Sequence, residues 1–145
     1  MAVPASPTTG ELAAEAWRAL LDYFFDNRDR HAALAAGFGL TVGDMKTLLS
    51  LQPDQPRSMS HLAADWKCDA SNVTWLVDRL EERGLVERRT SALDRRVKTV
   101  ALTTAGEATK EQVLARMYEP PDALRSLPRE DLEALIRVMA RVRAH

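Results

Sequence analysis

The middle of the sequence constrains the fold more than any other part, because it predicts a helix followed at once by a β-hairpin. Apolar residues recur at three- and four-residue steps through 70–83, the pattern of a helix with one buried face. Asp69 is placed to cap its start, and Gly84 stands where glycine commonly ends a helix. Short strand candidates follow at 85–89 and 97–102, with a polar, basic tip between them. The predicted buried face consists of Val73, Leu76, Val77 and Leu80.

The segment that precedes this unit is also predicted to be helical. Residues 11–36 carry a helical repeat of apolar side chains, which Gly37 ends. Thr41 is a suitable cap for a second helix, which must end before Pro53. Only a very short extended piece fits at 57–59.

A short helix lies directly upstream of the central helix. Ser60 is a suitable cap for residues 61–66, and residues 67–69 form a tight connection to the central helix. This pair predicts a helix-turn-helix, and the hairpin that follows predicts a wing. The sequence therefore predicts a mainly α fold with a small β-hairpin wing, whose winged helix-turn-helix lobe covers about residues 41–102.

The C-terminal third is predicted to contain two helices. Thr103 and Thr104 can cap a helix that reaches about Tyr118, where Pro120 and Pro121 must break or kink it. Pro128 then opens a final helix. The outer helices, about 11–36 and 104–144, have apolar faces without an obvious partner in so small a chain. We therefore expect helices 1, 5 and 6 to form a dimerisation stem.

Length and composition indicate one soluble domain. The chain has 145 residues and a formal net charge of −1, so only the placement of basic residues can indicate nucleic-acid binding. Residues 1–10 lack the basic and apolar parts of a signal peptide and are predicted to be a disordered tail before a single domain over 11–145. No apolar run predicts a membrane span. Cys68 is the only cysteine, which fits a cytoplasmic protein.

Two sequence motifs resemble those of a known family. The run ASNVTWLVDRLEERGLVERR at 70–89 resembles the recognition helix and first wing strand of MarR-type transcriptional regulators. Asp94-Arg95-Arg96, followed by VALTTAG at 100–106, resembles the wing of that family and the start of its fifth helix. The resemblance implies a homodimer that presents two recognition helices to successive major grooves of duplex DNA. Two departures are Trp75, where relatives more often have arginine or another polar residue, and the interruption at Pro120-Pro121.

The predicted recognition helix has a polar face opposite its buried stripe. Ser71, Asn72 and Thr74 are suited to hydrogen bonds with base edges or phosphates, and Trp75 is suited to packing on a thymine methyl group or a sugar. Arg79 lies on the same face at helical spacing. The alternative is that Trp75 covers a neighbouring loop or a partner chain.

The predicted wing is strongly basic. Residues 83–98 hold six positively charged residues against Glu87 and Asp94, a local net charge of +4. A solvated charged hairpin is the plain alternative. In the family, the arginine at the position of Arg96 enters the minor groove, which suits a flat, weakly hydrated guanidinium. The resemblance also implies that Asp94 holds the loop by pairing with an arginine and that Arg95 contacts phosphate, with Lys98 completing the predicted set.

The resemblance further implies a small lipophilic or aromatic effector that binds between the outer helices and the DNA-binding lobe. Candidate lining residues are Phe24, His31, Phe38 and Met45, for which ordinary core packing is an equally good interpretation. Cysteine-based peroxide sensing would require a cysteine near the start of the first helix, so a structural role is expected for Cys68. No histidine pair has metal-ligand spacing, so neither a metal nor another cofactor is expected.

These observations favour a cytoplasmic, sequence-specific DNA-binding repressor that acts as a homodimer on a pseudo-palindromic operator and is released by its effector. The alternative is a winged-helix module that binds protein instead of specific DNA sequences. A protein-binding winged helix has no need of a basic wing. No enzyme signature is present, and catalysis is not expected.

Overall fold

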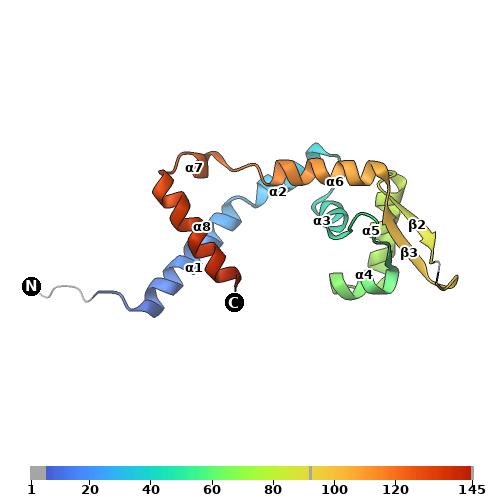
Figure 1. The fold of residues 1–145 in the computed structure, drawn as a ribbon, viewed down its shortest axis with the longest axis horizontal. Helices are drawn as coiled ribbons and strands as arrows, with labels where there is room; N and C mark the ends of the chain where they lie inside the picture. The colour runs from blue at the N-terminus through green and yellow to red at the C-terminus, as the bar shows by residue number, and fades with distance from the viewer. Residues whose placement is uncertain (1–5, 92, 145) are drawn as a thin grey trace, which may run out of the picture.

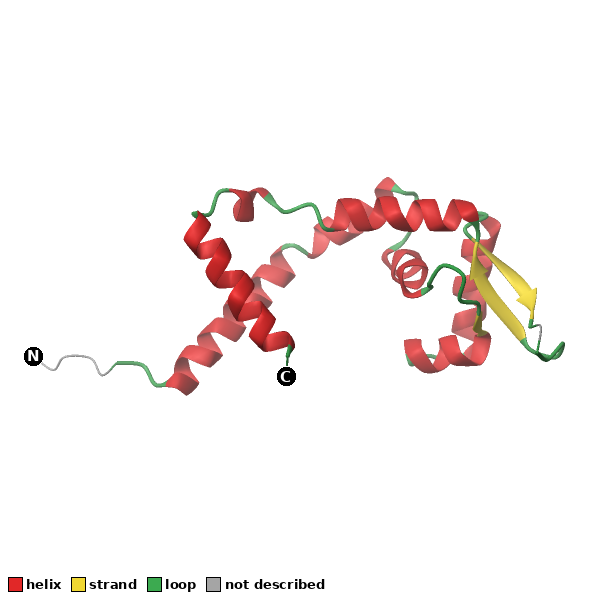
Figure 2. Ribbon diagram, in the orientation of Figure 1, coloured by secondary structure: helices red, strands yellow, loops and turns green. Residues whose placement is uncertain are grey.

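The computed structural model describes residues 6–91 and 93–144, and these form a mainly helical chain with one small antiparallel sheet (Figure 2). This architecture confirms the predicted mainly α fold with a hairpin wing. The elements within the described residues are α1 (Thr9–Asp26), α2 (Arg28–Gly37), α3 (Val42–Ser50), β1 (Arg57–Ser58), α4 (Met59–Trp66), α5 (Ala70–Glu82), β2 (Val86–Thr90), β3 (Lys98–Leu102), α6 (Thr104–Met117), α7 (Asp122–Arg125) and α8 (Arg129–Arg143).

The chain is elongated, with helices gathered at both ends (Figure 1). At one end lie α1, α7 and α8, and at the other lie α4, α5 and the sheet, with α2 and α6 between them. Across the described ranges, no helix combines the length and the apolar character that a membrane span requires.

The hydrophobic core lies in the lobe formed by α3, α4, α5, the sheet and α6. Three of the four residues of the predicted α5 stripe, Val73, Val77 and Leu80, are buried in this core, and the fourth, Leu76, is partly buried. By contrast, no residue of α1 or α8 is buried. The largest fully buried apolar side chains outside α5 are Leu48, Leu51, Leu62, Val86, Val100 and Val113.

Local capping chemistry sets most helix starts as predicted. Thr41 accepts a hydrogen bond from the Asp44 backbone N–H, while the Asp44 carboxylate accepts one from the Thr41 N–H, a reciprocal capping box. Asp69 caps α5 and Thr103 caps α6. The prediction for α4 was wrong by two residues, because Ser58, not Ser60, accepts the hydrogen bond from the backbone N–H of His61.

The first predicted helix is also corrected by the structure. Residues 11–36 form two helices, because the chain turns at Asn27, whose side-chain amide donates to the Tyr23 carbonyl at 2.8 Å. Short polar side chains that bond to nearby backbone in this way compete with a continuous helix. Helix α1 also starts at Thr9, two residues before the predicted start at residue 11, because Thr8 and Glu11 form a capping box. Of the predicted tail, residues 1–5 lie outside the described residues.

The chain is interrupted a second time where Pro120 and Pro121 follow α6, as predicted. Both interruptions lie at the same level of the molecule. The Arg30 guanidinium donates to the Glu119 carbonyl at 2.5 Å, and Asn27 and Pro121 line one small hollow of about 160 Å³. The start of α2 and the end of α6 therefore lie next to each other, between the two ends of the molecule.

The sheet and α6 are joined by an unusually close approach at Gly106. The strand order is β1-β3-β2, all antiparallel, with Val86 opposite Leu102 and Thr90 opposite Lys98. A Cβ atom on Gly106 would lie 1.8 Å from the Leu85 carbonyl oxygen. Glycine therefore allows α6 to start directly against the base of the wing.

Candidate nucleic-acid interface

Helix α5 buries one face and exposes the face that the sequence predicts for DNA contact. Ser71, Asn72, Thr74 and Trp75 are all exposed, and 53% of Trp75 is accessible. The opposite face is anchored in the core by Val73 and Val77. The helix therefore presents polar groups and an indole to the exterior while its axis is held by the core.

The polar groups of this face are partly occupied by local hydrogen bonds. The Ser71 hydroxyl donates to the Asp69 carboxylate at 2.7 Å, and the Thr74 hydroxyl donates to the Ala70 carbonyl at 2.9 Å. Both hydroxyl oxygens keep lone pairs that can accept a hydrogen bond. Hydrogen bonds from Ser71 and from the Asn72 backbone also hold the pKa of Asp69 below its ordinary value.

Arg79 is arranged differently from the rest of the predicted set. Its Nε donates to Asp44 Oδ1 at 3.0 Å and its Nη2 to Asp44 Oδ2 at 2.8 Å, a two-point ion pair between α5 and α3. Burial raises the pKa of Asp44, but hydrogen bonds from Arg79 and Thr41 outweigh it, so this pKa lies below its ordinary value. Sequence reasoning missed this partnership because the two residues are far apart in the chain.

The tip of the wing carries the exposed arginines. Asp94 accepts a hydrogen bond from the Arg96 backbone N–H at 2.8 Å, and the Val97 N–H donates to the Asp94 carbonyl at 3.0 Å. The expectation that Asp94 pairs with an arginine side chain was wrong for the described residues, because its carboxylate closes the turn through the backbone. Arg95 and Arg96 are exposed and form no ion pair within residues 6–91 and 93–144. Lys98 is also exposed, and its ammonium donates to the Thr90 hydroxyl at 3.1 Å.

The base of the wing is less basic than its sequence suggests. Arg88 pairs with Asp78 and Glu81 of α5, which ties β2 to the helix. Burial lowers the pKa of Arg88, yet these two carboxylates outweigh it and raise that pKa overall. Arg89 pairs with Glu87. Among the described residues of the wing, the basic side chains without an ion pair are therefore Arg95, Arg96 and Lys98, at the tip and beside it.

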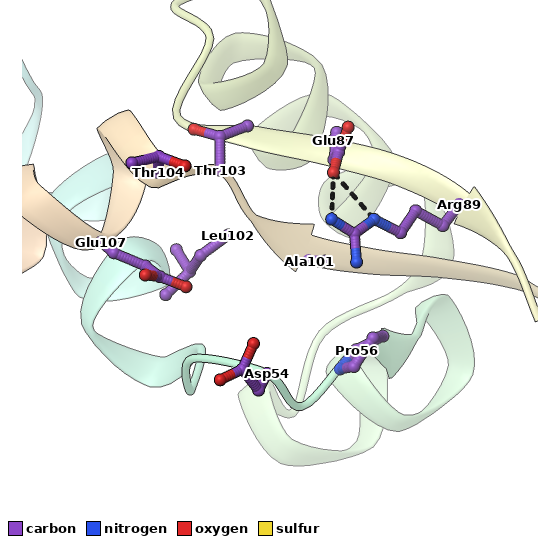
Figure 3. A pocket seen from close by; sticks show the side chains of 9 residues that line it. All are labelled: Asp54, Pro56, Glu87, Arg89, Ala101, Leu102, Thr103, Thr104 and Glu107. Carbon is purple, nitrogen blue, oxygen red and sulfur yellow. Dashed lines mark hydrogen bonds and ion pairs between the residues drawn. The ribbon is translucent and has the colours of Figure 1, made fainter.

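A polar hollow of about 580 Å³ lies beside the base of the wing (Figure 3). Three carboxylates line it, from Asp54, Glu87 and Glu107. Its basic residue, Arg89, is the one that pairs with Glu87, as the dashed lines show (Figure 3). Phosphate groups are repelled by such a surface, so this side of the wing is not suited to DNA.

A second, apolar hollow of about 390 Å³ gathers three of the four predicted effector-lining residues. Phe24, His31 and Met45 line it together with Val42, Leu49 and Met117. Phe38 does not join them, because it lines a different hollow, near Gly37 and Arg116. The prediction for Phe38 is therefore corrected. The hollow is lined from α1, α2, α3 and the end of α6, and the basic residues Arg28 and Lys46 also border it.

Comparison with known proteins identifies the family. A model of the MarR family matches residues 40–98, which hold α3, α4, α5 and the hairpin tip. A probable transcriptional regulator from Pseudomonas aeruginosa is 31% identical, with 83% of this chain and 93% of that chain covered and a TM-score of 0.58. The chain belongs to the MarR family. It is a winged helix-turn-helix transcriptional regulator and not an enzyme.

Other solved structures share the fold over nearly the whole chain. The YusO protein from Bacillus subtilis is 25% identical, with 95% of this chain and 99% of that chain covered and a TM-score of 0.77. A point mutant of MepR from S. aureus, solved bound to an oligodeoxyribonucleotide, is 19% identical. That alignment covers 91% of this chain and 96% of the MepR chain, with a TM-score of 0.68.

The MarR motif at 100–106 now has a physical explanation. Its final glycine is Gly106, which leaves room for the Leu85 carbonyl, and its first threonine is the α6 cap Thr103. The Thr103 backbone N–H also donates to Leu85 O at 3.1 Å. Cys68 is half-buried against the hydrophobic core, which agrees with the structural role expected for it.

Proposed function

We propose that this MarR-family protein represses transcription by binding a pseudo-palindromic DNA operator as a homodimer. The observation that carries the proposal is the combination of an exposed polar face on α5 with an uncompensated arginine pair at the wing tip. A recognition helix in the major groove and a wing in the adjacent minor groove would use these two surfaces together.

The α5 face supplies the sequence-reading part of the proposal. Ser71, Asn72 and Thr74 offer hydrogen-bonding groups to base edges, and Trp75 offers an apolar surface to thymine methyl groups. The Arg88 ties to Asp78 and Glu81 support this arrangement, because they hold the wing against the same helix. One domain would then contact neighbouring grooves as a rigid unit.

The wing tip supplies charge. Arg96 is the residue proposed to enter the minor groove, with Arg95 on phosphate and Lys98 beside them. The hydrogen bond from the Arg96 N–H to Asp94 supports this role, because it closes the turn that carries Arg96. Insertion would favour A·T-rich sequence, where the minor groove is narrow and electronegative.

The dimer is proposed from the unpartnered ends of the chain. Helices α1 and α8 bury no residue, although both carry large apolar side chains. An exposed apolar surface of this extent is typical of an obligate interface. The exposed apolar residues concerned are Leu12, Trp17, Leu20, Tyr23, Phe24, Phe25, Leu135, Ile136, Val138, Met139 and Val142.

The apolar hollow lined by Phe24, His31 and Met45 is the proposed effector site. Its size and lining suit a small lipophilic or aromatic molecule. Binding there would weaken DNA binding if it favoured a dimer whose recognition helices have the wrong spacing, a coupling of about 1–3 kcal/mol. A thermal-shift screen of aromatic acids tests the proposed effector site. Each shift in Tm is compared with the shift in a Met45→Trp variant, whose larger side chain fills the hollow. An upward shift that persists in the variant would place the ligand elsewhere.

The main experiment measures binding to duplexes from the protein's own upstream region by fluorescence anisotropy at several salt concentrations. Arg96→Ala should weaken binding and make the log K against log salt slope shallower by about one phosphate-equivalent per wing, or two per dimer. The matched control is Arg129→Ala, which removes an arginine that is 90% exposed on α8 and should leave the slope unchanged. Equal slopes for wild type and Arg96→Ala would remove the wing from the mechanism.

Trp75→Ala separates sequence reading from charge. The variant should change the base preference with little change in salt slope, because an indole releases no counterions. Competition with random duplex provides the measurement. Equal affinity of the wild type for the operator and for random duplex would favour the alternative function, a winged helix that binds protein.

A further inference from the structure

Trp75, the exposed aromatic residue on the reading face of α5, is supported from behind by a chain of fixed groups. The Arg79 guanidinium carbon lies 4.9 Å from the centre of the Trp75 ring, a cation–π contact one helical turn along α5. The same guanidinium makes the two-point ion pair with Asp44. The guanidinium therefore lies over the indole and is held by two hydrogen bonds to one carboxylate.

Asp44 is itself immobilised in α3. Its carboxylate is fully buried and also accepts a hydrogen bond from the Thr41 N–H at 2.9 Å, so it is both a member of the α3 capping box and the anchor of Arg79. Helix α3 packs closely on α5 at this point, where a Cβ on Gly43 would lie 3.7 Å from a methyl group of Leu76. The support of Trp75 thus begins in the packed interface between two helices.

We propose that Arg79 is a positioning residue that sets the sequence preference of the protein through Trp75, with Asp44 as its anchor. This rests on the proposed function, because it takes Trp75 as a DNA contact. It replaces the expectation that Arg79 reads DNA directly. Two of its nitrogens are bonded to Asp44, and 37% of its side chain is exposed.

The physical role is to order the indole before DNA arrives. A half-exposed tryptophan without a neighbour samples several rotamers and can reorient to accommodate a changed base pair, so the affinities for the correct and the changed sequence differ less. Contact with a guanidinium that is bonded at two points to Asp44 restricts the ring in the free protein. A contact of this kind at an exposed site corresponds to an effect of about two- to fivefold.

The test compares Arg79→Met, Arg79→Lys and Trp75→Ala, and the double variant Arg79→Met with Trp75→Ala. The readout is the ratio of affinities for the operator and for an operator with one base pair changed in the α5 half-site. Arg79→Met should lower this ratio about two- to fivefold. The double variant should match Trp75→Ala alone, because Arg79 has no effect once the indole is gone. Additive losses would overturn the proposal and give Arg79 its own DNA contact.

Arg79→Lys distinguishes positioning from charge. Lysine keeps the positive charge and can pair with Asp44, but it lacks the flat surface and the two-point geometry. Positioning therefore predicts that Arg79→Lys loses discrimination much as Arg79→Met does. Full retention of the ratio by Arg79→Lys would overturn the proposal. This variant keeps Asp44 paired, so it remains informative if Arg79→Met is too unstable to purify.

A measurement without DNA tests the contact itself. Protein labelled with 5-fluorotryptophan should give one fluorine resonance for each of the three tryptophans, and Trp75→Phe identifies the one from Trp75. Arg79→Lys should shift this resonance and leave those of Trp17 and Trp66 in place. An unshifted Trp75 resonance would overturn the proposal. If instead Trp75→Ala leaves base preference unchanged while the resonance does shift, the proposed DNA contact of Trp75 fails and the support of the indole stands.

Discussion

Replacing Gly106 with alanine should destabilise the protein, although alanine usually stabilises a helix relative to glycine. A Cβ at this position would lie 1.8 Å from Leu85 O and 2.9 Å from its carbonyl carbon, both backbone atoms. Helix α6 must therefore retreat by about 1 Å, since Cβ contacts below 3.0 Å are essentially never seen. The retreat breaks the bonds from the Thr103 N–H to Leu85 O and from the Thr103 hydroxyl to Gly84 O.

The magnitude follows from these contacts. Two lost hydrogen bonds contribute about 1 kcal/mol each, and overpacking against backbone contributes roughly 1–3 kcal/mol. The better helix propensity of alanine offsets about 1 kcal/mol of this. The free energy of unfolding should therefore fall by about 2–4 kcal/mol, a large part of a total of about 5–15 kcal/mol. For a chain of this size, the Tm should fall by roughly 6–15 °C.

The effect is measured by urea unfolding, monitored by far-UV circular dichroism. All variants are compared at one protomer concentration, because dimerisation would contribute to stability. Gly37→Ala is the matched control. Gly37 is also helical, and a Cβ there meets nothing within 4 Å, so this variant should be as stable as the wild type or slightly more stable. A Gly106→Ala protein that unfolds at the same urea concentration as Gly37→Ala would show that α6 does not need glycine at this contact.

Charged and apolar groups elsewhere in the chain give three further predictions. Because the pKa of Asp44 is lowered in the folded protein, its contribution to stability is present above about pH 4 and is lost below that pH. Asp44→Asn should therefore be less stable than wild type at neutral pH, and the difference in their free energies of unfolding should narrow when unfolding is measured at acid pH. Lys110 donates to the carbonyls of Leu49 and Leu51, and burial lowers its pKa, so the wild type gains stability as pH rises towards the unfolded value of about 10. Lys110→Met should therefore show a stability deficit that grows as pH rises towards about 10, and a constant deficit would contradict this. Ile136 is 69% exposed on α8, and Ile136→Asp should give a monomeric mass by light scattering at micromolar concentration, whereas an unchanged mass would move the interface elsewhere.

Features determined by neighbours in the chain could be predicted from the sequence. Asp69, Thr41 and Thr103 cap helices because the groups they bond to lie three residues away, so the signal is local. The buried stripe of α5 follows from helical periodicity alone. Asn27 shows where local reasoning fails, because an asparagine inside an apolar repeat carries no periodic signal of a break.

Pairing between distant residues could not be predicted in this way. The +4 charge counted for residues 83–98 does not reveal that Arg88 and Arg89 are paired with carboxylates, which leaves the tip as the basic part. The partnership of Arg79 with Asp44 joins positions 35 apart, and only the packing of α5 on α3 brings them together. Phe38 has the same apolar character as Phe24 and Met45 but faces another hollow, since the turn at residues 37–39 directs it away.

The interruptions at Asn27 and at Pro120-Pro121 lie side by side and together form a hinge between the end that holds α1 and α8 and the lobe that holds the wing. Helix α6 has 14 residues, so it extends about 21 Å from this level towards the wing. A rotation of about 10° at its near end displaces its far end by roughly 4 Å. In a two-fold dimer both lobes would swing, so their separation would change by up to roughly 8 Å against a helical repeat of about 34 Å. A change too small to disturb the core is thus large enough to bring two recognition helices out of phase with the DNA.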